Sequence, residues 1–131
     1  MTIGSYKLIQ GLDPHCVIAC GLIGGYVPRI SHADLVKGAP ATVARLDAER
    51  RVFYNVAGKA RDTLVLSTVQ RAETALAEKL QMDARRTRRE HGKEVVVLER
   101  SCFIDETGDA APSSVSGEQF LAELDRNLAS G

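Results

Sequence analysis

The stretch His15–Ile30, HCVIACGLIGGYVPRI, is the most apolar part of the chain and limits most strongly what the chain can form. Its continuous apolar run, Cys16–Val27, spans 12 residues, whereas a helix that crosses a membrane needs about 20. Apolar residues follow one another without alternation, which is typical of a strand with both faces buried. Gly24 and Gly25 would permit a sharp turn after this strand. We therefore expect an interior strand and no membrane segment.

The composition is that of a folded domain without overall charge. A length of 131 residues suits a single domain over residues 1–131, and a hydrophobic fraction of 44% is ordinary for a soluble protein. Lys+Arg and Asp+Glu both number 17, so no global field directs the chain to nucleic acid or membrane. Three cysteines, an odd number, argue against a disulfide framework. No targeting signal is visible, and the sequence therefore predicts a cytoplasmic protein.

Charge is nevertheless uneven along the chain. Residues 41–100 carry 13 basic and 9 acidic side chains, whereas residues 101–131 carry six acidic side chains and one basic side chain, Arg126. The simplest interpretation is internal complementarity, with the acidic C-terminal part lying near the basic middle. The alternative is that the uneven charge gives the molecule a dipole through which it binds a partner.

Two segments carry the signals of a helix start. Ser31 fits an N-cap, Ile30 and Leu35 form a hydrophobic staple around it, and Gly38 ends the helix, which predicts a short helix near residue 32. Ser116 and Gln119 form a capping box before a predicted helix over Gly117–Ala129. The side chains that this helix would present to a core are Phe120, Leu121, Leu124 and Leu128.

A longer helix is predicted over Thr68–His91. At 100° per residue, five apolar side chains fall in one stripe roughly 120° wide. They are Val69, Ala72, Leu76, Leu80 and Ala84. Ser67 and Gln70 resemble a capping box, and Gly92 is a natural stop. We expect this helix to lie at the centre of the domain.

Strands are predicted in the remaining segments. Thr42–Leu46 and Arg50–Val56 have a period of two and suggest a hairpin, and Tyr6–Gln10 alternates weakly. Asp62–Ser67 adds a further strand, although a helix that begins at Asp62 is an alternative. Lys93–Ile104 is rich in β-branched residues. If Asp62–Ser67 is a strand, it forms a right-handed βαβ-like crossover with Lys93–Ile104 through the long helix.

Together these elements predict an α+β fold. We expect one mostly antiparallel or mixed sheet of about five strands. A long central helix, the C-terminal helix and the short helix near residue 32 would pack against it. Residues 105–115 form a loop that could be flexible.

The cysteines offer limited chemistry. On a strand, Cys16 and Cys20 would point the same way but lie about 13 Å apart, too far for a disulfide. Their spacing is not the Cys-x-x-Cys of zinc or redox motifs. We expect both thiols in the core as small hydrophobes, and His15 exposed. A thiol-dependent enzyme would need Cys16 or Cys102 beside a histidine in a cleft.

Motifs for cofactors and metals are incomplete. Gly21–Gly25 does not match the dinucleotide-binding glycine pattern, and Gly58–Ala60 lacks both the first glycine and the hydroxyl residue of a phosphate loop. The histidines and Cys102 have no metal-ligand spacing. Asp105–Asp109 lacks the alternating oxygens of a calcium loop. The sequence therefore predicts no catalytic residue, no cofactor and no metal.

Four arginines are the clearest candidate site. Arg85, Arg86, Arg88 and Arg89 would fan out from the last turns of the long helix, and guanidinium groups facing solvent suit phosphate binding. Cations at a helix C-terminus are also favoured by the helix dipole, and no aromatic residue interleaves them for base stacking. The leading hypothesis is thus a non-enzymatic domain that binds a protein partner or a second copy of itself. Nucleic-acid binding through these arginines and a thiol-dependent enzyme are the alternatives.

Overall fold

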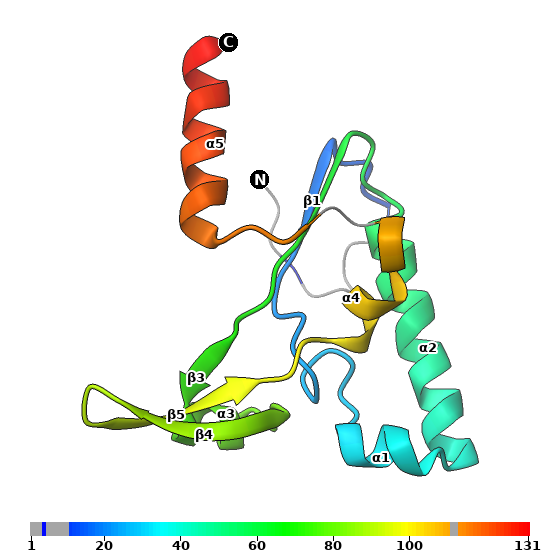
Figure 1. Ribbon diagram of the computed structural model, residues 1–131. Helices are drawn as coiled ribbons and strands as arrows, with labels where there is room; N and C mark the ends of the chain where they lie inside the picture. The colour runs from blue at the N-terminus through cyan, green and yellow to red at the C-terminus, as the bar shows by residue number, and fades with distance from the viewer. Residues whose placement is uncertain (1–3, 5–10, 111–112) are drawn as a thin grey trace.

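The structure, a computed structural model, describes residue 4 and the ranges 11–110 and 113–131, so the segment Tyr6–Gln10 lies outside the described residues. The α+β class is confirmed. In chain order the elements are β1 (Cys16–Ala19), α1 (His32–Lys37), α2 (Pro40–Ala57), β2 (Thr63–Leu66), β3 (Arg71–Glu73), α3 (Thr74–Lys79), β4 (Ala84–Glu90), β5 (Lys93–Leu98), α4 (Cys102–Glu106), a 3₁₀ turn (Gly108–Ala110) and α5 (Gly117–Ser130) (Figure 1).

The strands of the described residues form two small sheets, so the prediction of one sheet of about five strands is wrong. β1 pairs in parallel with β2, and α1 and α2 supply the crossover that parallel strands require. The second sheet is antiparallel in the order β3–β5–β4. The strand expected at Asp62–Ser67 is confirmed as β2, but it pairs with β1 instead of the segment Lys93–Ile104. The expected crossover between those two segments is therefore wrong.

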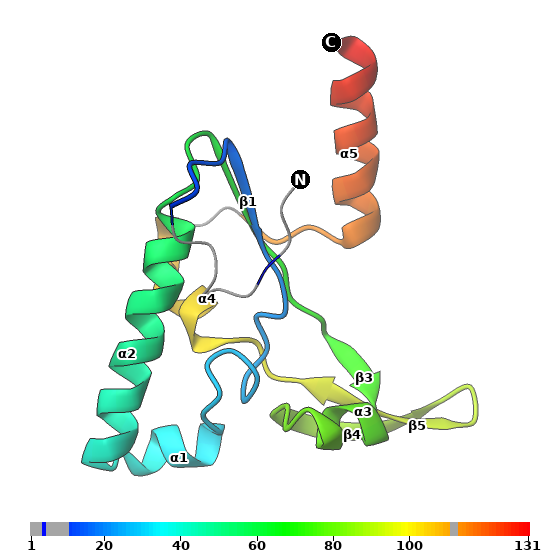
Figure 2. The ribbon, with the colours of Figure 1, turned by 180° about the vertical axis from the view of Figure 1, so that it is seen from behind.

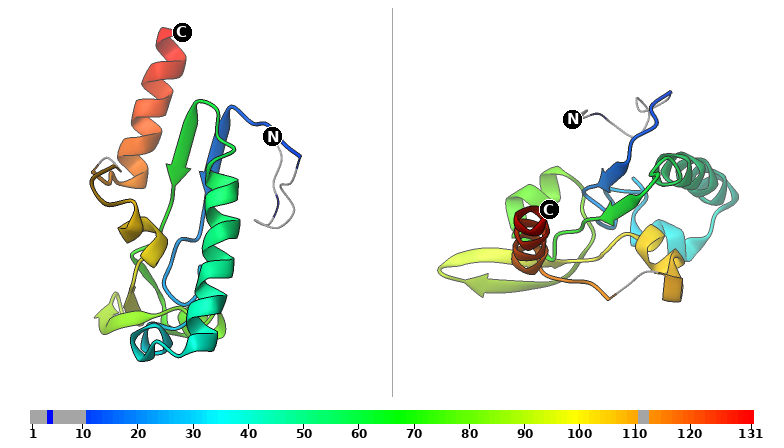
Figure 3. Two further views of the ribbon diagram at one scale, coloured as in Figure 1. Left: turned by 90° about the vertical axis from the view of Figure 1, so that its right-hand side faces the viewer. Right: turned by 90° about the horizontal axis from the view of Figure 1, so that it is seen from above.

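A helix of 18 residues, α2, replaces the hairpin expected over Thr42–Val56. Pro40 lies in its first turn, where the missing N–H costs nothing. Phe53 and Val56 are buried, and Leu46 packs against the cluster that contains Phe53. The spacing of these three residues fits the 3.6-residue period. The left view of Figure 3 shows α2 running beside β1 and β2.

The long helix predicted over Thr68–His91 is also wrong, because β3, α3 and β4 occupy this segment. Gln81, with φ 55°, directly follows Leu80, the C-cap of α3. His91 and Gly92 have φ angles of 50° and 77° and connect β4 to β5. Two positive φ angles in a two-residue connection are the geometry of a type I′ hairpin turn. Gly92 is therefore a hairpin residue and not a helix stop.

The apolar stretch His15–Ile30 contributes a strand of only four residues. Val17 and Ala19 are buried while Cys16 and Ile18 are exposed, so β1 is covered on one face and not on both. The turn expected at Gly24 and Gly25 is confirmed.

Among the described residues, most of the buried hydrophobic side chains form two clusters. Ala19, Leu22, Phe53 and Phe103 form the first, and Ile23, Ala77, Val96 and Leu98 form the second. Ile23 also makes an isolated bridge to Arg100, which joins the two halves through the backbone.

Both predicted cap-initiated helices are confirmed. The Ser31 hydroxyl accepts from the Asp34 N–H at the start of α1, and Ser116 and Gln119 form the capping box of α5. However, α5 buries none of its residues, so the prediction that it packs its apolar side chains on the core is wrong. Figures 1 and 2, seen from opposite sides, both show α5 standing away from α2 and from the two sheets.

Candidate functional site

The four arginines predicted as a site lie on a strand and not on a helix. Arg85, Arg86, Arg88 and Arg89 belong to β4, an edge strand of the β3–β5–β4 sheet, and all four are exposed. The right view of Figure 3 shows the β4–β5 hairpin projecting from the molecule on the side away from α2. Since side chains alternate between the two faces of a strand, these arginines cannot form one continuous fan.

The sheet register assigns them to faces. Arg86 lies opposite Val97 and Arg88 opposite Val95, and paired residues share one face. The opposite face carries Val96 and Leu98, which pack on Ala77 of α3. We call the uncovered side the outer face. Its side chains are Arg71, Glu73, Arg86, Arg88, Glu90, Lys93, Val95 and Val97.

Ion pairs leave a net positive charge on the outer face. Arg71 Nη1 lies 3.0 Å from Glu90 Oε1, and Lys93 Nζ lies 2.7 Å from Glu73 Oε1. The hydrogen bond from Lys93 lowers the pKa of the Glu73 carboxyl and raises that of the lysine. Arg86 and Arg88 have no ion pair with any described residue, and they stand beside half-buried Val95 and Val97.

The other two arginines do not contribute to this surface. Arg85 forms a bidentate pair with Glu99, and hydrogen bonding from Arg85 lowers the pKa of the Glu99 carboxyl. A register shift between Ala84 and Arg86 takes Arg85 out of the regular pairing. Arg89 lies opposite Glu94, with the parity of the covered face. The structure therefore brings together Arg86 and Arg88 and separates both from Arg85 and Arg89.

The second candidate surface is the apolar stripe of α5. At 100° per residue, Phe120, Leu124, Leu128 and Leu121 span an arc of about 100°. Leu121, Leu124 and Leu128 are 59%, 43% and 72% exposed. On the same wheel Glu118 and Asp125 flank one edge of the stripe and Glu123 flanks the other, while Arg126 lies on the far side.

The expected internal charge complementarity is only partly present. Glu106 accepts hydrogen bonds from Arg50 on α2, and Asp105 pairs with Arg100. The three acidic residues of α5 make no ion pair with any described residue. The negative charge of α5 is thus available to another surface.

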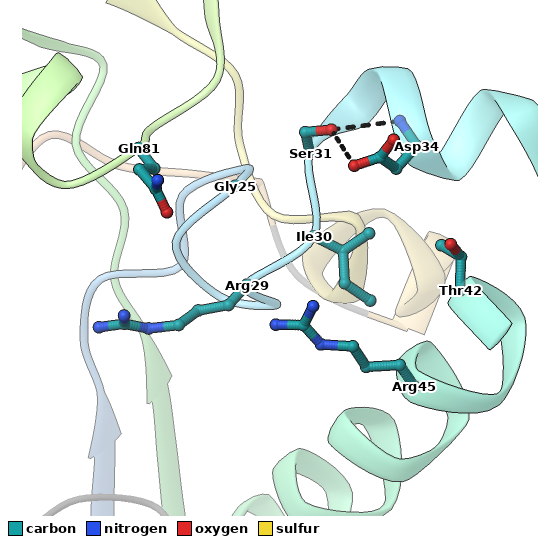
Figure 4. A pocket seen from close by; sticks show the side chains of 8 residues that line it. All are labelled: Gly25, Arg29, Ile30, Ser31, Asp34, Thr42, Arg45 and Gln81. Carbon is teal, nitrogen blue, oxygen red and sulfur yellow. Dashed lines mark hydrogen bonds between the residues drawn. The ribbon is translucent and has the colours of Figure 1, made fainter.

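A pocket of about 480 Å³ opens between the loop before α1, the start of α2 and the end of α3. In Figure 4 the Arg45 side chain reaches from α2 toward the backbone of Arg29, while the Arg29 side chain extends in the direction away from Arg45, and Gln81 points toward Arg29 from across the pocket. Ile30 supplies an apolar wall. These residues come from three separate elements and are far apart in the sequence. No spacing in the sequence therefore predicted the pocket.

The thiols are placed differently from the prediction. Cys16 and Cys20 are exposed and not in the core, and Cys102 on α4 is half-buried. Burial, followed by the nearby Glu106 carboxylate, raises the pKa of the Cys102 thiol. The imidazole of His15 is exposed as expected, and its Nδ1 contacts the Asp62 carboxylate.

We expect the two exposed thiols to react much faster than Cys102 with a small alkylating reagent at neutral pH. The thiolate is the reactive form, and the raised pKa and burial of Cys102 keep its thiolate rare and inaccessible. Mass spectrometry of peptides after timed exposure to iodoacetamide measures the three rates. Faster alkylation of Cys102 than of Cys16 would contradict this assignment and would favour a nucleophilic role for it.

Within the described ranges, no group of three or more His, Cys, Asp or Glu side chains could hold a metal ion. None of the helices in those ranges is long and apolar enough to cross a bilayer. Comparison of the sequence with known proteins gives no match to any protein-family model and none to a curated protein.

Proposed function

We propose that this chain is a non-enzymatic cytoplasmic domain that associates with a second copy of itself, with α5 of one copy docked on the outer face of the other. The observation that carries the proposal is that α5, a capped helix of 14 residues, buries none of them although it has a continuous apolar stripe. An exposed apolar stripe of this kind is the usual sign of an interaction surface.

The dimensions of the two surfaces match. A helix of 14 residues is about 21 Å long, and a strand of seven residues such as β4 is about 23 Å long. Val95 and Val97 provide an apolar line along the outer face against which Leu121 and Leu124 can pack. A two-fold dimer would form this contact twice, which doubles the buried area toward the roughly 1,200–2,000 Å² of a stable interface.

The charges of the two surfaces are complementary. Arg86 and Arg88 are the cations of the outer face that form no ion pair with a described residue, and the carboxylates of Glu123 and Asp125 border the stripe of α5. Docking would place carboxylates over guanidinium groups at the rim and leucines over valines at the centre. Such an arrangement gives an interface its specificity and orientation.

The first test is the oligomeric state of the full chain. Sedimentation velocity over a wide range of concentration is expected to show a dimer that dissociates on dilution. Leu124→Lys should weaken the dimer about tenfold or more, because a charge would enter the centre of the contact. Arg126→Lys, on the far side of the same helix, is the matched control and should leave the dissociation constant unchanged.

A charge swap tests which surfaces meet. Arg86→Glu with Arg88→Glu should weaken the dimer, and so should Glu123→Lys with Asp125→Lys. An equimolar mixture of the two double variants should restore a dimer, now between the unlike chains. Arg89→Glu, on the same strand but with the opposite parity, is the control and should have little effect.

The outcomes separate the alternatives. A monomer at every concentration would overturn the proposal, and a dimer that survives all these variants would overturn this interface. Nucleic acid is the other partner that Arg86 and Arg88 suit. If DNA or RNA is retarded at low salt, and Arg86→Glu with Arg88→Glu abolishes the retardation while Leu124→Lys does not, the outer face binds phosphates and not α5.

A further inference from the structure

We infer that the pocket between α1 and α2 binds a small organic anion, whose carboxylate or phosphate group is held by the guanidinium groups of Arg29 and Arg45. A volume of about 480 Å³ lies within the range of sites for small molecules. This site is separate from the outer face and from α5, and it does not depend on self-association.

The hydrogen-bond donors of the pocket are largely unused. The Arg29 guanidinium lies over the Tyr26 ring, 5.5 Å from its centroid, and makes no hydrogen bond with a described side chain. Thr42 and Gln81 line the pocket, and neither side chain is hydrogen-bonded within the described ranges. A guanidinium presents a planar set of N–H groups that matches a carboxylate or phosphate in bidentate fashion.

The acidic groups nearby are already engaged. Asp34 accepts a hydrogen bond from the Ser31 hydroxyl (2.9 Å), as Figure 4 shows, and lies 3.8 Å from Lys37 Nζ. Glu49 accepts from the Arg29 backbone N–H (2.9 Å) and lies 3.6 Å from Arg45 Nε. That second contact is an ion pair longer than a hydrogen bond, and the terminal nitrogens of Arg45 form no hydrogen bond with a described residue.

The shape of the pocket indicates the rest of the ligand. Ile30 is buried and contributes an apolar wall on the Arg45 side of the pocket. Gly25 contributes backbone without a side chain. An anion that carries a small apolar body would use both features, whereas an inorganic ion would use only the guanidinium groups.

The test is a titration of the 131-residue chain at low salt with phenyl phosphate, benzoate, inorganic phosphate and uncharged phenol. Backbone amide NMR shifts are expected to change near Arg29, Arg45 and Gln81 and to saturate with phenyl phosphate or benzoate. Inorganic phosphate should bind less tightly, and phenol should not bind. Whether phenyl phosphate or benzoate binds more tightly decides between a phosphate and a carboxylate ligand.

Variants decide whether the two arginines hold the anion. Arg29→Gln and Arg45→Gln should each weaken binding about tenfold or more, while Arg45→Lys, which keeps the charge but loses the bidentate geometry, should have an intermediate effect. Arg51→Gln, an exposed position of α2 outside the pocket, is the matched control and should change nothing. Leu124→Lys should bind as the wild type does, so this inference and the self-association proposal fail separately.

Two results would overturn the inference. One is the absence of saturation with every probe up to about 10 mM, the range in which binding energy becomes negligible. The other is equal weakening by Arg51→Gln and by the two pocket variants, because that pattern indicates a diffuse attraction to positive charge and not a site.

Discussion

Replacing Phe103 with alanine is expected to lower the free energy of unfolding by about 3–5 kcal/mol. The side chain is 1% exposed, and its ring stacks on Phe53 with centroids 5.0 Å apart and planes at 21°. Ala19 and Leu22 complete the same cluster, so Phe103 joins α4 to β1 and α2. Removal of the Phe103 ring leaves a cavity in a core of few buried residues. The expected loss of unfolding free energy is a large part of the 5–15 kcal/mol typical of a domain.

Urea unfolding followed by circular dichroism measures this loss. Val36→Ala is the matched control, because Val36 is 73% exposed and its truncation should change stability by less than about 0.5 kcal/mol. If the alanine variant does not fold, Phe103→Leu should still fold, with a loss on the order of 1.5 kcal/mol. Equal stability of the Val36 and Phe103 variants would show that the two aromatic rings do not form the centre of the first cluster.

Gly25→Ala is expected to destabilise the protein by about 2–4 kcal/mol. Gly25 has φ 76°, and a Cβ there would lie 2.4 Å from the carbonyl oxygen of Gln81 and 3.0 Å from the backbone nitrogen of Asp83. A left-handed conformation costs a residue with a Cβ about 1–2 kcal/mol, and the clash adds to that cost. The segment that must move is fixed, because the Asp83 N–H donates to the Gly24 carbonyl (2.7 Å) and the Asp83 carboxylate accepts from the His32 N–H (2.8 Å).

Gly38→Ala separates the two contributions to this effect. Gly38 has φ 63° but nothing within 4 Å of the position of a Cβ, so alanine there should cost only the conformational part, about 1 kcal/mol. Thermal and urea unfolding of both variants give the comparison. Equal losses at the two positions would mean that the loop at Gly25 does not approach Gln81 closely.

The elements that could be predicted from sequence are those specified by local signals. The short helix after Ser31 and the helix after Ser116 begin where the caps predict, because a capping hydroxyl satisfies backbone N–H groups only a few residues away. The strands at Thr63–Leu66 and Lys93–Leu98 follow from their β-branched and apolar content. Cys102–Ile104, predicted as the end of the strand Lys93–Ile104, instead belongs to α4, which begins after the Ser101 cap.

The errors in the predicted secondary structure arise where the apolar pattern fits both the two-residue period of a strand and the 3.6-residue period of a helix. In a strand, one face would carry Val52, Tyr54 and Val56. In a helix, one face carries Leu46, Phe53 and Val56 instead. The structure adopts the helix because this face is buried against β1 and α4. The choice depends on partners that are distant in sequence.

β4 shows the same limit more strongly. Its sequence ARRTRRE has no apolar alternation, and arginine favours helices on its own. The segment is a strand because the turn at His91 and Gly92 folds it back on β5, whose valines have strong strand preference. Tertiary pairing thus overrides local preference. The candidate site was identified by residue type, but the separation of Arg86 and Arg88 from Arg85 and Arg89 depends on that pairing.

The two clusters of the core meet at consecutive residues, since Leu22 belongs to the first and Ile23 to the second. One peptide unit therefore places a side chain in each of the two clusters. Insertion or deletion of a single amino acid at this point would rotate one of the two side chains out of its cluster. The chain can vary in length at its surface loops. At Leu22 and Ile23, both the number of residues and their apolar character are constrained.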